Sequence, residues 1–186
     1  MRQLFLFERP SRFVAGTVGT PGDRTFYLQA VDGGRVVSVA LEKQQVQVLA
    51  DRLEQLLDEI VARTGTALPA AAADTAALEQ PVDEEFRVAA MGLKWDGDTG
   101  LVMIEAQAPV ESVAEAEETL LEDVEEGPDA LRVLIEPRVA RSFVDRARKI
   151  VSAGRPPCPL CGEPLDPAGH VCVRLNGYHR GVSLQQ

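Results

Sequence analysis

The chain has 186 residues, of which 45% are apolar and 26% charged, and this globular composition excludes wholesale disorder. The formal net charge of −10 argues against a generic nucleic-acid coat or a binder of anionic membranes. No apolar run approaches the roughly 18–20 residues that a membrane helix needs. The first apolar run, residues 4–7, is also too short for the core of a signal peptide. We therefore expect a cytoplasmic protein without membrane contact.

The first 63 residues contain strand patterns followed by one helix pattern. Asp32-Gly33-Gly34 predicts a hairpin turn between the last two strands, because glycine readily adopts the positive φ that such turns need. A helix is predicted from about Lys43 to Ala62, where apolar residues recur at intervals of three and four. The predicted strands are residues 12–18, 25–31 and 35–41.

The same order of patterns returns in residues 81–153. The Ala-rich stretch between the halves, residues 64–80, is typical of a linker and is expected to be mobile. A helix is predicted from about Pro137 to Val151, since proline suits a first helical turn, where its missing N–H costs nothing. The predicted strands of this half are residues 84–94, 100–107 and 131–135.

The two halves align without gaps over their last strand and helix, at an offset of 94 residues. Glu42 falls on Glu136, and Arg52 falls on Arg146. Chance is the alternative to a true duplication, because any two amphipathic strand–helix units share some pattern. We expect residues 1–153 to form an α+β body, in which two βββα-like halves build one antiparallel sheet of about six strands with two helices on it.

Charge is distributed unevenly along the second half. Residues 111–129 contain nine acidic residues and no basic one, whereas residues 137–155 contain six basic residues and one acidic residue. The acidic run is typical of a solvated loop or exposed helix; the alternative is a strap that pairs with the basic helix or with a partner. The basic run is typical of an exposed helix face, favoured by the helix dipole. The alternative is an anion site, with Arg138, Arg141 and Arg148 as its candidates.

The C-terminal segment, residues 154–186, contains all three cysteines, in the pattern C-x2-C-x8-H-x-C. An odd number of clustered cysteines is a poor disulfide framework, whereas C-P-x-C-G is the usual form of a zinc knuckle. Three thiolates and one imidazole complete a tetrahedral zinc sphere, which is the closed pattern of a structural site. We expect structural Zn2+ to order this short polar segment. The alternatives are another metal such as iron, redox chemistry, or incidental cysteines in a tail. The predicted ligands are Cys158, Cys161, His170 and Cys172.

Three catalytic interpretations of these residues fail or are incomplete. A zinc deaminase also needs an upstream H-x-E, and no histidine precedes His170. A thioredoxin-like pair must open a helix, which the prolines and glycine around Cys158 and Cys161 oppose. A Cys–His nucleophilic pair would leave the other cysteines unexplained. An enzyme would need catalytic residues elsewhere, for example in a groove between the two halves.

Residues 174–180 follow the cysteine motif and contain a strong turn signal, Asn176-Gly177. Zinc ribbons often bind nucleic acid through basic-aromatic tips, where arginine pairs with phosphate and a ring stacks on a base. The alternative is a partly packed tail. The candidate contacts at this tip are Arg174, Tyr178 and Arg180.

The tail resembles a specific family. Three stretches are similar to members of an uncharacterised actinobacterial family, a domain of unknown function of about this size. They are the strand–helix unit LRVLIEPRVARSFVDRARKIVSAGRPP, the motif CPLCGEPLDPAGHVC and the stretch RLNGY. These motifs cover roughly the last third of the chain, and the preceding order of elements is loosely similar. The resemblance implies a cytoplasmic protein with a C-terminal zinc knuckle; it carries over no catalytic residue.

The sequence therefore favours a non-enzymatic zinc-binding protein that acts in protein interaction or regulation, with another protein as its partner. A nucleic-acid-binding protein that uses the basic helix and the tip is the first alternative. An enzyme of unknown type with its site between the halves is the second.

Overall fold

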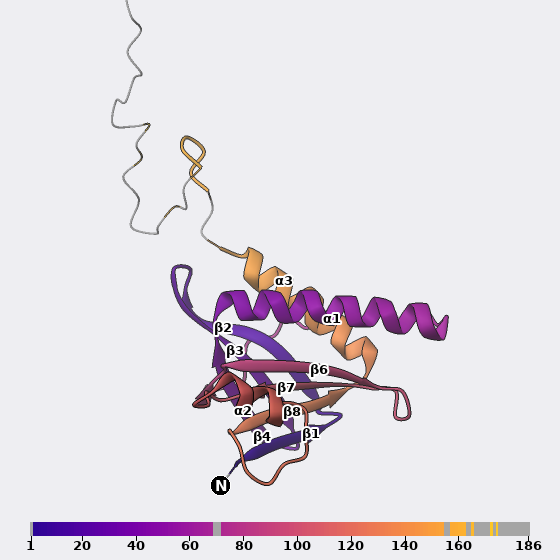
Figure 1. Cartoon of the computed structure of the whole chain (residues 1–186). Helices are drawn as coiled ribbons and strands as arrows, with labels where there is room; N and C mark the ends of the chain where they lie inside the picture. Colours follow the sequence, from indigo (N-terminus) through magenta and orange to yellow (C-terminus); the bar gives the residue numbers. More distant parts are fainter. Residues whose placement is uncertain are drawn as a thin grey trace, which may run out of the picture.

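The computed structural model describes residues 2–68, 72–154 and 157–162, together with Leu165, Cys172 and Arg174. The fold is α+β, as predicted, and Figure 1 shows two helices crossing each other on one side of the strands. The helices are α1 (Lys43–Thr64), α2 (Val113–Thr119) and α3 (Pro137–Ser152).

The strands form two four-stranded sheets rather than the single antiparallel sheet of about six strands that we predicted. One sheet has the order β1 (Leu4–Glu8), β8 (Ala130–Ile135), β7 (Leu101–Gln107) and β6 (Ala90–Asp96). The other has the order β2 (Arg12–Thr20), β3 (Asp23–Asp32), β4 (Arg35–Leu41) and β5 (Glu84–Arg87).

The prediction of the sheet was wrong because each half gives its first strand to the other half. β1 pairs in parallel with β8 of the second half, and β5 pairs in parallel with β4 of the first half. Each sheet is therefore mixed: an antiparallel three-stranded meander with one parallel strand from elsewhere in the chain. This exchange binds the halves to one another through backbone hydrogen bonds.

Both predicted long helices are confirmed, with their ends within two residues of the expected positions. Gly65 caps the C-terminus of α1: its N–H donates to the carbonyl of Val61, and its φ of +66° is a left-handed conformation that glycine adopts at little cost. α3 begins with Pro137 in its first turn, as predicted.

The two long helices bury side chains at positions that are equivalent in the alignment at an offset of 94 residues. The buried residues of α3 lie at the positions equivalent to four buried residues of α1, and these side chains pack into one core with both sheets. Phe13 of β2 stacks on Phe143 of α3 with ring centroids 5.0 Å apart, so the helix of the second half packs on a strand of the first. The equivalent pairs are Val46 and Ala140, Leu49 and Phe143, Ala50 and Val144, and Leu53 and Ala147.

Candidate metal centre

The three cysteines come together beyond the end of α3. The Sγ atoms of Cys158, Cys161 and Cys172 all lie within 4.8 Å of one another, and those of Cys158 and Cys172 are 3.9 Å apart. All three are free thiols; Cys158 and Cys172 are buried, whereas Cys161 is half-buried. This spacing suits three sulfur ligands around one ion, since Zn–S bonds are about 2.3 Å long.

The backbone between the first two cysteines turns as a knuckle requires. The N–H of Gly162 donates to the carbonyl of Cys158 across 2.8 Å, and Gly162 has a φ of +79°, a conformation that favours glycine. Hydrogen bonds from the backbone N–H of Cys161, and then from that of Leu160, lower the pKa of the Cys158 thiol. The loop therefore stabilises a thiolate, which is the form of cysteine that binds metal.

The fourth predicted ligand, His170, lies outside the described residues. The structure thus brings together three of the four predicted ligands, across fourteen residues of sequence from Cys158 to Cys172. These three cysteines could hold a metal ion.

The candidate anion contacts on α3 lie beside acidic partners. Arg148 binds Glu54 of α1, with 2.5 Å between Nη2 and Oε2, and Arg141 lies 3.4 Å from Asp58. Arg138 is 2.6 Å from Glu136. These pairs join α3 to α1 or to its own N-terminus, so an anion would compete with carboxylates for each of them. Arg174 is exposed, whereas Tyr178 and Arg180 lie outside the described residues.

Comparison with family models gives one match. Residues 5–172 match the model described as "Protein of unknown function (DUF3090)". The chain belongs to this family. The matched region covers both sheets except Leu4, and it includes all four predicted ligands. No curated protein and no solved structure matches the chain.

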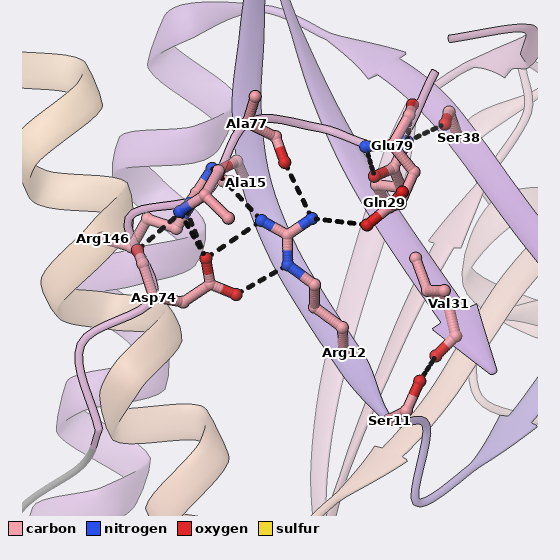
Figure 2. Close-up of polar contacts among 11 residues, drawn as sticks. Ser11, Arg12, Ala15, Gln29, Val31, Ser38, Asp74, Ala77, Glu79 and Arg146 are labelled. Carbon is pink, nitrogen blue, oxygen red and sulfur yellow. Dashed lines mark hydrogen bonds and ion pairs between the residues drawn. The ribbon is translucent and has the colours of Figure 1, made fainter. Parts of the chain in front are cut away.

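The expected mobile linker, residues 64–80, is instead held to the body over residues 72–79. Arg12 of β2 binds both carboxylate oxygens of Asp74, and Arg146 of α3 donates to Asp74 across 2.8 Å (Figure 2). Gln29, which is fully buried, donates to the carbonyl of Glu79 and accepts from its N–H, as a neighbouring strand would. The composition of this segment, small and Ala-rich with only Asp74 and Glu79 charged, does not indicate that arginines and a glutamine of the body bind it.

These arginines line a cavity of about 430 Å³ between β2 and α3, where the two halves meet. Its polar groups bind other parts of the chain. Arg146 also donates to the carbonyl of Ala15 in β2 across 2.7 Å, and Ser142 donates to that of Ala72. The cavity lies between the halves, where an enzyme would have its site, but its contacts hold residues 72–78 against the body.

Among the described residues, the acidic run contacts Arg132 of β8 and Arg2, which precedes β1, rather than the basic helix. Glu105 of β7 is completely buried between Arg2 and Arg132, at 3.0 and 2.5 Å. Arg132 also binds the carboxylate of Asp123 and the carbonyl of Glu122. The run thus covers this face of the sheet. An arginine between two apolar residues of a predicted strand, as in LRVLI, is the sequence signal that could have revealed the network.

None of the helices in the described part of the chain has an apolar stretch long enough to cross a membrane.

Proposed function

We propose that the chain is a non-enzymatic protein whose C-terminal segment is ordered by structural Zn2+, held by Cys158, Cys161, His170 and Cys172. The observation that carries the proposal is the convergence of three sulfur atoms within 4.8 Å on a turn that favours thiolates. Sulfur is a soft ligand, and Cys3His is a common structural zinc set. His170 lies two residues before Cys172 and is the nearest histidine to the cluster in sequence.

A complete set of four protein ligands leaves no open position for a substrate or an activated water, so the metal would serve as a staple. Clustered cysteines without a disulfide are typical of proteins in reducing compartments, which supports a cytoplasmic location. We assign the protein to interaction or regulation, with another protein as its partner. The arginines in the cavity between the halves bind residues 72–78 of the chain itself, which supports this assignment over an enzyme with its site there.

The experiment is elemental analysis of the purified full chain and of single variants. We expect one zinc per chain in the wild type and a loss of most of it in Cys158→Ser and in His170→Ala. The chain has two histidines, so His179→Ala is the matched control and should retain full zinc. A wild type without stoichiometric metal would overturn the proposal; retention of zinc by His170→Ala would remove the imidazole from the site.

A further inference from the structure

The cavity between β2 and α3 has a counterpart in the other half of the molecule. A groove of about 470 Å³ lies between α1 and the edge strand β6, and we call it the α1–β6 groove. The residues that α1 contributes to it are equivalent, at the offset of 94, to those that α3 contributes to the cavity on β2. On α1 they are Gln44, Gln45, Val48, Leu49 and Arg52; on α3 they are Arg138, Val139, Ser142, Phe143 and Arg146.

In the cavity on β2 the equivalent helix positions bind an extended segment of the chain itself. Ser142, the counterpart of Val48, donates to the carbonyl of Ala72 across 2.5 Å. Arg146, the counterpart of Arg52, donates to the carboxylate and carbonyl of Asp74. This site therefore shows which occupant such a groove accepts: an extended stretch of small residues with one carboxylate aimed at the helix arginine.

The α1–β6 groove keeps the helix arginine of that cavity, Arg52, but has Val48 in place of the hydroxyl donor Ser142, and no described residue occupies it as residues 72–78 occupy the cavity on β2. Arg52 is exposed, and the structure gives it no hydrogen bond or ion pair in the described part of the chain. Glu42, the acidic residue that lines the groove, binds Arg87 at 3.0 Å. Glu59, which lines the neighbouring pocket together with Arg52, lies 3.9 Å from Arg63.

The apolar wall of the groove is also incompletely covered. Val48 is 47% exposed, and Met91 and Leu93 of β6 are only half-buried. β6 pairs with β7 alone, so its other edge has no strand partner in either sheet. An unpaired strand edge beside an apolar wall is the arrangement to which extended peptides add.

We propose that the α1–β6 groove binds an extended acidic segment of a partner protein, whose carboxylate pairs with Arg52 and whose small apolar side chains pack on Val48, Met91 and Leu93. Two observations support this proposal: an extended acidic segment occupies the equivalent cavity, and Arg52 has no ion-pair partner among the described residues. The proposal goes beyond the metal site and holds whether or not the tail binds zinc.

The test uses the full chain with methyl-labelled Met, Leu and Val, titrated with a peptide of residues 72–79, Ala-Ala-Asp-Thr-Ala-Ala-Leu-Glu. The tethered copy of this segment has the advantage of a high effective concentration in its own cavity, so added peptide reports on the open groove. We expect saturable shifts of the Met91 and Leu93 methyl signals, while Met103, which lines neither site, serves as internal reference.

The charge of Arg52 should decide the affinity. We expect Arg52→Glu to lower the affinity for the peptide by about tenfold or more, because the variant loses one ion pair and gains a repulsion between two carboxylates. Lys149→Glu makes the same charge change at an exposed position of α3 that lines neither the groove nor the cavity on β2, and this variant should bind as the wild type does. A peptide with Asn in place of its Asp should also bind the wild type more weakly than the parent peptide does, but by less than the loss in Arg52→Glu, because it removes the attraction without adding repulsion.

Three results would overturn the proposal: no saturable shift of the Met91 methyl signal, shifts that Arg52→Glu leaves unchanged, or shifts of this signal on raising protein concentration without peptide. The last would place a second copy of the chain in the groove. Zinc content, measured on the same samples, reports separately on the metal proposal.

Discussion

Arg146 of α3 donates a hydrogen bond to Asp74 across 2.8 Å, which ties the helix of the second half to the segment that follows the helix of the first. Arg12 binds the same carboxylate from β2. One carboxylate thus compensates two partly buried guanidinium groups, whose side chains are 14% and 11% exposed. This contact explains why an Ala-rich segment lies ordered against the body.

Asp74→Ala should destabilise the protein by about 2 kcal/mol, because it leaves two neighbouring guanidinium groups without their shared carboxylate. The measurement is the free energy of unfolding from urea denaturation. Asp145 of α3 is exposed and has no ion pair in the described part of the chain, so Asp145→Ala is the control and should change stability little. Equal losses in the two variants would contradict the assigned role of Asp74.

The contribution of Asp74 should depend on pH. The hydrogen bond from Arg12 is the largest cause of a folded-state pKa below the ordinary value of 3.8. A lowered pKa stabilises the folded protein fully above the unfolded-state pKa, and this stability is lost as the pH falls through the lower folded-state pKa. The difference in unfolding free energy between wild type and Asp74→Asn should therefore be larger at about pH 6 than at about pH 3. A difference independent of pH would exclude the charge as its cause.

Glu105→Gln should destabilise the folded protein more than a Glu→Gln substitution on the surface does. Its carboxylate is completely buried between Arg2 and Arg132, and removing one partner of a buried network typically costs about 3 kcal/mol. Thermal unfolding of Glu105→Gln, compared with that of Glu118→Gln on the exposed surface of α2, measures the effect. Similar melting temperatures for the two variants would show that the network contributes little.

Gly16 and Leu78 should behave as a coupled pair. A Cβ on Gly16 would lie 2.5 Å from the side chain of Leu78, so Gly16→Ala should destabilise by about 1–3 kcal/mol through overpacking. Leu78→Ala makes room for that methyl group, and the double variant should therefore be less destabilised than the sum of the two single variants. Additive losses in urea denaturation would show that Leu78 does not pack on Gly16 in solution.

The sequence predicted the α+β class, both long helices and the meander of each half because period and turn signals are local. It missed β1, since Leu4 to Phe7 are all apolar and hide the alternation in which Phe5 and Phe7 are buried. It merged β5 with β6, although the chain passes from one sheet to the other between them. Parallel pairing between strands more than 100 residues apart, such as β1 with β8, leaves no local pattern.

For the candidate site, ligand spacing was sufficient to select the cysteines, because a metal imposes few geometries on a short motif. The contacts of Asp74, Gln29 and Glu105 depend on which elements meet in space, and single-sequence periodicity carries no such information. The alignment at an offset of 94 residues is the exception: it pairs Arg52 with Arg146, and the structure places these two residues in equivalent grooves.

X-ray absorption at the zinc edge of the purified full chain tests the central claim most directly. The account predicts three sulfur atoms at about 2.3 Å and one nitrogen atom at about 2.0 Å from a single zinc. A first shell of oxygen and nitrogen alone, or the absence of zinc from the protein, would contradict it.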